Sequence, residues 1–175
     1  LGTATLAAIR FAIEHQYDLL VTMDADYSHH PCYIPALLAA MPAVGGRTEN
    51  VDVAIGSRYV AGGGIDGWAI SRRIMSRLMN AFARIWLRLP IRDCTGAFRC
   101  YRVSTLACVD SERIRSRGYS FFEEILWRLA RSGARMVEVP IVFTDRTKGS
   151  TKLNRHEAWQ AVTTIATLPW ADKST

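Results

Sequence analysis

Hydrophobic residues recur along the chain at two spacings, which predict helices and strands in alternation. Leu6, Ile9 and Ile13 recur at helical spacing in a segment that ends near His15. The apolar run over residues 18–23 has the length of a strand and stops abruptly on polar residues. This order of elements predicts an α/β fold.

Both spacings continue through the rest of the chain. Strand-like runs cover residues 51–56, 98–103 and 134–143, and helical patterns cover residues 33–41, 70–89, 120–133 and 156–168. Pro140 in the last of these strands favours an edge strand or a bulge, since proline cannot donate to a sheet. The glycine-rich stretch 62–67 lacks the pattern of a phosphate-binding P-loop, and we interpret it as a mobile loop hinged on glycine.

Length and composition fit one folded domain, with 175 residues of which 49% are hydrophobic. The four cysteines show no C-x-x-C spacing, so a reduced, cytoplasmic setting is the simpler expectation. No run reaches the ~18 apolar residues that a membrane-spanning helix needs. Any membrane association of this segment is therefore expected to be peripheral. Because the chain begins on a helix and without methionine, we expect a further N-terminal part upstream of Leu1.

The net charge of +6 favours anionic partners, which include phosphorylated ligands, lipid surfaces and nucleic acid. On the helix predicted at 70–89, arginines line a face beside the apolar stripe, at positions Arg73, Arg77, Arg84 and Arg88. This face is either a solvated helix surface or a basic amphipathic surface for lipid headgroups or a phosphorylated acceptor. No nucleic-acid motif or stacking aromatic pattern interleaves the basic residues, so we expect no nucleic-acid partner.

Two carboxylates, Asp24 and Asp26, directly follow the strand predicted at 18–23. Ligands of open α/β sheets bind outside the carboxyl ends of the strands, and two such carboxylates can share one hard divalent cation. The alternative is that both acids only cap the following turn. His29 and His30 are better interpreted as turn residues than as ligands, because hard cations prefer oxygen.

Other polar residues fall at the ends of predicted elements. Arg58 follows the strand at 51–56, and Asp93 precedes the strand at 98–103 in a compact stretch that would equally suit a simple turn. Glu123 has capping-box spacing from Ser120, which leaves Glu124 without an obvious structural role. Arg146 and Lys152 surround Gly149 in a stretch that suits either a polyphosphate clamp or a solvated loop.

Four ordered motifs, together with GTA at residues 2–4, resemble the dolichol-phosphate (polyprenol-phosphate) mannosyltransferases, which are inverting glycosyltransferases of GT-A fold. They are MDADYSHHP at 23–31, GSRY at 56–59, DCTGAFR at 93–99, and DR at 145–146 with GSTKL at 149–153. The resemblance covers nearly the whole chain. It implies that residues 1–175 form a single glycosyltransferase catalytic domain with a mixed, mostly parallel sheet flanked by helices, and that the N-terminal nucleotide-binding strands are missing.

The resemblance also implies roles for individual residues. Asp24 and Asp26 would hold Mg²⁺ or Mn²⁺ against the sugar-nucleotide diphosphate, and Glu124 aligns with an acidic residue near the reaction centre. Phe122 stands where the family frequently has glutamine. The residues expected to be catalytic are Asp24, Asp26, Asp93 and Glu124. Those expected to bind the donor diphosphate or the acceptor phosphate are Arg58, Arg73, Arg77, Arg99, Arg146 and Lys152, with Arg72 as an alternative to Arg73 or Arg77.

The implied reaction is metal-dependent transfer of mannose from GDP-mannose to polyprenyl (dolichyl) phosphate, with inversion, at the cytoplasmic face of a membrane. A phosphate monoester has a second pKa of ~6 and is already nucleophilic, so a strong general base is less necessary than for a sugar hydroxyl. The nearest alternative is a transferase of the same fold that moves glucose or another sugar. A non-catalytic basic membrane-binding protein is a remote alternative, since it leaves Asp24, Asp26 and Asp93 unexplained.

Overall fold

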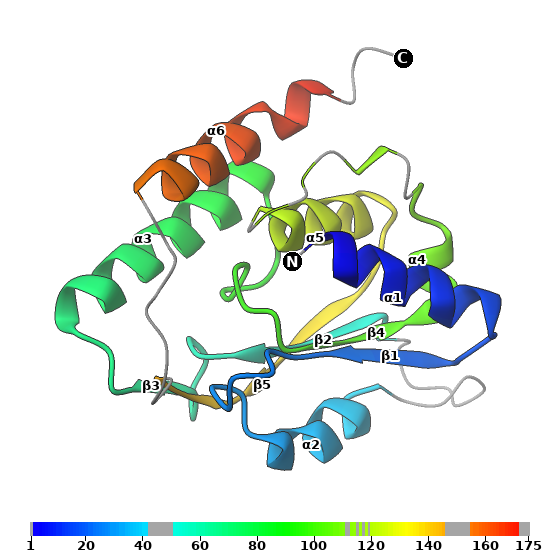
Figure 1. Cartoon of the computed structure of the whole chain (residues 1–175), viewed down its shortest axis with the longest axis horizontal. Helices are drawn as coiled ribbons and strands as arrows, with labels where there is room; N and C mark the ends of the chain where they lie inside the picture. Colours follow the sequence, from blue (N-terminus) through cyan, green and yellow to red (C-terminus); the bar gives the residue numbers. More distant parts are fainter. Residues whose placement is uncertain are drawn as a thin grey trace.

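A four-stranded sheet lies between two layers of helices in the computed structural model of this chain (Figure 1). The structure describes residues 2–41, 51–110, 113, 114, 116, 118, 120–145 and 155–171; for 155–161 and 171 it describes the backbone alone. Helix α2 covers one face of the sheet, and helices α1, α4 and α5 cover the other (Figure 1). Helices α3 and α6 lie side by side beyond them (Figure 1).

The strand order is β1-β4-β2-β5, with bounds Leu19–Thr22, Arg99–Arg102, Val53–Ser57 and Met136–Pro140. Strand β4 runs antiparallel to both of its neighbours, whereas β2 and β5 are parallel. Strands β1, β2 and β5 therefore share one direction, which confirms the predicted mixed, mostly parallel sheet. Their carboxyl ends meet the beginning of β4 at one edge, because Thr22 and Ile55 both pair with Arg99.

Alternating side chains of β2 build the two halves of the core. Val53 and Ile55 point into a large cluster with residues of α1, α3, α4, α5 and α6, while Ala54 points into a smaller cluster with Leu37 of α2. All five residues of β2 are buried, as expected for a strand that is covered on both faces. The stretch preceding the candidate site residues is thus held rigidly from both sides.

The predicted helices are present, with ends that differ by a few residues. They are α1 (Gly2–Glu14), α2 (Ile34–Ala39, after a 3-10 turn at Pro31–Tyr33), α3 (Ile70–Leu87), α5 (Phe121–Arg131) and α6 (Arg155–Ala171). Helix α3 ends two residues before the predicted Leu89, because Arg88 adopts a left-handed conformation with φ 53°. Helix α4 (Val103–Ala107) was not predicted, because five residues are too few to display a helical period. Among the described residues, no helix combines the length and the apolar content needed to cross a membrane.

Two sequence predictions need correction near the glycine-rich stretch. The run predicted as one strand over 134–143 breaks at Ile141 into β5 and β6 (Val142–Thr144). Strand β6 pairs with β3 (Gly64–Asp66), so the prediction of a mobile loop is wrong for these three residues. Gly63 is needed for close approach, since a Cβ there would lie 2.5 Å from the Ser57 carbonyl oxygen. Pro140 lies in β5 at the edge of the four-stranded sheet, as predicted.

Candidate active site

The loops that carry the candidate residues meet at the carboxyl edge of the sheet. The Thr22 hydroxyl donates to the Ala97 carbonyl oxygen at 2.7 Å, and the Gly56 amide donates to the Phe98 carbonyl oxygen at 2.9 Å. These bonds tie the ends of β1 and β2 to the segment that leads into β4. The structure therefore brings the Asp24–Asp26 turn, Arg58 and the 93–99 motif to one edge, as the predicted parallel arrangement requires.

The turn that contains Asp24 and Asp26 is organised by its own polar groups. The backbone amide and the hydroxyl of Ser28 both donate to Asp26 Oδ1, which is an Asx-type turn, and Tyr27 adopts φ 63°. The Ser28 carbonyl oxygen accepts a bond from the Thr144 amide, which joins the turn to β6. The turn-capping interpretation thus holds for Asp26. The Asp24 carboxylate is 36% exposed and is therefore accessible to a cation.

His29 is buried behind this turn and packs against Phe98 and Phe143, with ring centroids 5.2 and 5.1 Å away. Burial, together with the charge of Arg58, lowers the pKa of His29 to about 4, so the ring is neutral at physiological pH. Its Nδ1 accepts a bond from the Asp24 amide at 3.2 Å. The 3.6 Å approach of Nδ1 to the Asp24 carboxylate is therefore not an ion pair.

His30 has an equally local role, because its Nδ1 accepts a bond from the Cys32 amide at the start of the 3-10 turn. Both histidines thus act as turn residues, as the sequence favoured. Within the part of the chain that the structure describes, no three His, Cys, Asp or Glu side chains gather closely enough to hold a metal ion by themselves. Two carboxylates are enough for a hard divalent cation that keeps water or substrate oxygens at its other positions.

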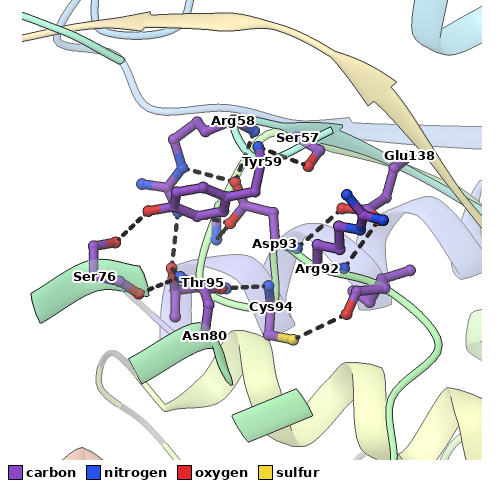
Figure 2. Close-up of polar contacts among 12 residues, drawn as sticks. Ser57, Arg58, Tyr59, Ser76, Asn80, Arg92, Asp93, Cys94, Thr95 and Glu138 are labelled. Atoms are coloured by element: carbon purple, nitrogen blue, oxygen red, sulfur yellow. Dashed lines mark hydrogen bonds and ion pairs between the residues drawn. The ribbon is translucent and has the colours of Figure 1, made fainter. Parts of the chain in front are cut away.

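Arg58 and Asp93 form a buried ion pair at the centre of the site (Figure 2). Arg58 Nε donates to Asp93 Oδ2 at 2.7 Å, and Nη2 donates to Oδ1 at 2.6 Å. The backbone amides of Arg58 and Gly96 also donate to this carboxylate. Burial by itself raises the pKa of Asp93, but the charge and hydrogen bonds of Arg58 outweigh it and hold the pKa below its usual range. Asp93 is therefore ionised.

The loop over residues 92–95 is fixed by two side chains that sequence reasoning missed. Asn80 of α3 accepts bonds from the Cys94 and Thr95 amides, and its Nδ2 donates to the Thr95 hydroxyl (Figure 2). Glu138 of β5 accepts bonds from the amides of Arg92 and Asp93 (Figure 2). In the sequence, each of these two positions shows only a polar residue inside a predicted helix or strand, which is not a distinctive signal. The loop is thus held from a helix and a strand at once.

Aromatic rings surround the basic groups of the site. The Arg58 guanidinium lies between 5.2 and 5.7 Å from the ring centroids of Tyr59, Trp68 and Phe143. Arg72 stacks on Trp68 at 3.9 Å and pairs with Asp145 at 2.9 Å. Such stacking fixes a guanidinium without removing its charge.

Arg72, rather than Arg73 or Arg77, joins the basic cluster. Arg73 and Arg77 are exposed on α3, whereas Arg72 is half-buried beside Trp68. Ser76, one turn after Arg72, accepts a bond from the Tyr59 hydroxyl at 2.7 Å (Figure 2). We call Arg58, Arg72, Tyr59 and Ser76 the basic cluster. Lipid-phosphate binding by Arg73 and Arg77 stays a prediction.

Arg99 is completely buried and faces the protein interior. Its Nη2 donates to the Cys94 carbonyl oxygen at 2.6 Å, and its Nη1 donates to the Phe122 carbonyl oxygen at 2.8 Å. The guanidinium carbon lies 4.9 Å from the Phe122 ring centroid. Arg99 thus connects the 93–99 motif to the start of α5. Its predicted contact with substrate stays a prediction, and the contacts seen here position other residues.

The two adjacent acids of α5 have roles that differ from those expected. Glu124 is buried, accepts a bond from the Ser116 amide at 2.8 Å, and pairs with Arg128 at 2.8 Å. The expected capping box is absent, because Ser120 makes no side-chain capping bond. Glu123 is also buried, and its Oε2 has no hydrogen-bond partner among the residues that the structure describes. The predicted catalytic role of Glu124 stays a prediction, and Arg146 and Lys152 lie outside the described residues.

Comparison with known proteins shows which family this chain belongs to. The chain is 40% identical over 165 residues to the undecaprenyl-phosphate mannosyltransferase of Micrococcus luteus, an alignment of 94% of this chain with 65% of that protein. It is 37% identical over 166 residues to the polyprenol monophosphomannose synthase of Mycolicibacterium smegmatis, covering 95% of this chain and 60% of that protein. The chain thus spans somewhat less than two thirds of the length of either relative. These identities confirm the resemblance to polyprenol-phosphate mannosyltransferases. Residues 1–110 match the family described as Glycosyl transferase family 2, and the chain belongs to this family.

Proposed function

We propose that this chain is the main part of a catalytic domain that transfers mannose from GDP-mannose to polyprenyl monophosphate. The observation that carries the proposal is an acidic turn next to a basic cluster at one sheet edge. The Asp24 amide donates to His29 Nδ1, and the His29 ring packs against Phe143. The Arg58 guanidinium lies 5.7 Å from the centroid of the same Phe143 ring. The names of the two relatives support mannose as the sugar and a polyprenyl phosphate as the acceptor.

The donor atoms at the acidic turn suit Mg²⁺ or Mn²⁺. Asp24 and Asp26 offer carboxylate oxygens, which hard divalent cations prefer, and the Ser28 bonds orient the Asp26 carboxylate. His29 offers no competing ligand through Nδ1, because that atom already accepts the Asp24 amide. A divalent cation bound here would neutralise the negative charge of the departing diphosphate. Enzymes of this family commonly depend on such a cation.

The basic cluster suits the acceptor. A dianionic phosphate approaching a sugar diphosphate meets strong repulsion, and fixed positive groups offset it. Arg58 is held by Asp93 and Arg72 by Trp68, so both charges are oriented before the acceptor arrives. In the proposed in-line displacement, an acceptor phosphate oxygen forms a bond to the anomeric carbon as the bond to the GDP oxygen breaks. The configuration inverts, and no proton has to move.

The exposed side of α3 suits a membrane surface. Ile70, Ile74, Leu78 and Ile85 are all more than half exposed, and Ile85 reaches 76%. Exposed arginines run beside this apolar strip, at Arg73, Arg77, Arg84 and Arg88. An apolar strip bordered by basic residues is the pattern of a helix that lies in a lipid interface. We infer that α3 docks on the cytoplasmic face of the membrane that carries the acceptor.

The direct test is transfer of radiolabelled sugar into polyprenyl phosphate in vesicles, with GDP-mannose and UDP-glucose as separate donors. The proposal predicts labelled lipid from GDP-mannose and little from UDP-glucose. Preferential use of UDP-glucose would favour a glucosyltransferase, and binding to vesicles without transfer from either donor would favour a non-catalytic membrane protein. Glu14→Gln, at an exposed position of α1, is a matched control that should leave transfer unchanged.

A further inference from the structure

Glu123 is a buried acid for which neither the fold nor the proposed reaction accounts. It is 4% exposed, and within the described part of the chain its buried Oε2 has no hydrogen-bond partner. Its place in the first turn of α5 favours the ionised form, because helix N-termini attract negative charge. A buried carboxyl group without a full set of partners destabilises a fold unless it is protonated, and such groups are concentrated at functional sites.

Arg99 of β4 lies beside the start of α5, because its Nη1 donates to the carbonyl oxygen of the preceding residue, Phe122, at 2.8 Å. Arg99 Nε, like Glu123 Oε2, is buried without a hydrogen-bond partner among the described residues. Asp93 in the loop before β4 and Arg58 at the end of β2 also shift the pKa of Glu123. Cys94 also lies in this field, but burial raises the pKa of its thiol to about 12, so it stays neutral. Asp93 is ionised and paired with Arg58. Glu138 adds a further carboxylate, which accepts the Asp93 amide. Ionisation of Glu123 therefore adds one more negative charge to a set in which Arg58 and Arg99 are already matched by Asp93 and Glu138.

We propose that Glu123 is a positioning residue whose charge sets the affinity of the basic cluster for the phosphate of the acceptor. The inference rests on the proposed function and deepens it. Glu123 is too deeply buried to touch the acceptor, so it acts through Arg58 and Arg99. Arg99 in turn holds the carbonyl oxygens of Cys94 and Phe122.

Glu123 changes its protonation state near neutral pH. Burial raises its pKa to about 7, against the opposing effects of its own backbone amide and of Arg99. Below that pH Glu123 is neutral and does not oppose the attraction of the basic cluster for the phosphate. Above it Glu123 is ionised and the attraction falls. One unit charge about 10 Å away at an effective dielectric constant of about 20 changes affinity by roughly tenfold.

The experiment compares acceptor binding by the wild-type protein and by Glu123→Gln between pH 6 and pH 8.5. Polyprenyl monophosphate in phosphatidylcholine vesicles is the probe, without donor, and transfer assays give KM and kcat separately. The affinity of the wild type should fall roughly threefold to tenfold more than that of Glu123→Gln across this range, with the difference in KM and not in kcat. Titration of the acceptor phosphate itself affects both proteins equally and cancels in the ratio.

Glu124→Gln is the matched control, because it removes the neighbouring acid that pairs with Arg128. It should keep the pH dependence of the wild type, whatever its effect on turnover. Glu123→Met serves as a second neutral variant if the glutamine variant fails to fold. Equal pH dependence in wild type and both Glu123 variants, with transfer intact, would overturn this inference alone. Absence of transfer by the wild type at every pH would overturn the proposed function and the inference with it.

Discussion

Arg58 and Asp93 form a two-pronged ion pair in which Nε lies 2.7 Å from Oδ2 and Nη2 lies 2.6 Å from Oδ1, with both side chains buried. The pair joins the end of β2 to the loop before β4, across 35 residues of sequence. It gives Arg58 a fixed orientation beside Tyr59, Trp68 and Phe143. The same contact therefore serves the stability of the site and the placement of its central positive charge.

Removing one partner of this pair should destabilise the protein strongly. Asp93→Asn leaves the Arg58 guanidinium buried without a counter-charge, and the free energy of unfolding should fall by about 3–5 kcal/mol. Urea denaturation followed by tryptophan fluorescence measures the change. Asp66→Asn, at an exposed acid of β3, is the control and should change stability by less than about 0.5 kcal/mol. A similarly small effect of Asp93→Asn would show that the pair is not required for stability.

Asn80→Ala should loosen the loop over residues 92–95. The substitution removes the acceptor of two backbone amides, those of Cys94 and Thr95, and should lower the free energy of unfolding by about 2–3 kcal/mol. Asn80→Asp keeps an acceptor oxygen at the same place, now on a carboxylate, and should be more stable than the alanine variant. Hydrogen exchange of the Cys94 amide reports on the bond directly. Exchange as slow in Asn80→Ala as in the wild type would contradict this role.

Glu123 should give the protein a stability that declines as pH rises. Its pKa is raised from 4.5 to about 7 by burial, so between these values the folded chain binds more protons than the unfolded chain. The stabilisation is complete below pH 4.5 and is lost as pH rises through 7, by an amount on the order of 2–3 kcal/mol. Melting temperatures between pH 5 and pH 8 measure it, and Glu123→Gln should flatten the curve. An unchanged slope in that variant would assign the decline to other groups.

Polar substitutions on α3 should weaken membrane binding without unfolding the protein. Ile74 and Ile85 are 54% and 76% exposed, so Ile74→Ser and Ile85→Ser should hardly change stability. If both side chains enter the lipid interface, each change should lower the affinity for anionic vesicles by roughly tenfold, as expected for losing about 1.5 kcal/mol of apolar burial. Vesicle sedimentation measures the affinity. Phe11→Ser, at an exposed apolar position of α1, is the control, and equal effects of all three substitutions would argue against α3 as the docking surface.

Local spacing was sufficient to predict most of the helices and strands and the sheet edge where the motifs gather. Residues 18–23 form an apolar run of strand length, and 70–89 carry a long amphipathic pattern, so β1 and α3 were predicted. The direction of β4 and the break at Ile141 depend on tertiary pairing and leave no local signal.

The sequence did not predict which side chains pair across the fold. Spacing placed Arg58 and Asp93 at the ends of predicted strands but did not predict that they pair. The family resemblance implied a substrate contact for Arg99, which stays a prediction, and no sequence pattern predicted that this side chain is buried. The predicted capping box of Ser120 and Glu123 was wrong for a related reason. A capping box is a local pattern, whereas the contacts of Glu124 depend on Ser116 and Arg128, and those of Glu123 depend on which face of α5 meets β4.

Mannosyl transfer by variants of the acidic turn shows whether Asp24 and Asp26 hold a cation that the reaction needs. Radiolabelled transfer from GDP-mannose into polyprenyl phosphate is measured with Mg²⁺ or Mn²⁺ for the wild type, Asp24→Asn and Asp26→Asn. Transfer should require the divalent cation and should fall by roughly a hundredfold or more in either variant, while vesicle binding persists. Undiminished transfer in both variants, or full transfer after the cation has been chelated, would contradict this requirement.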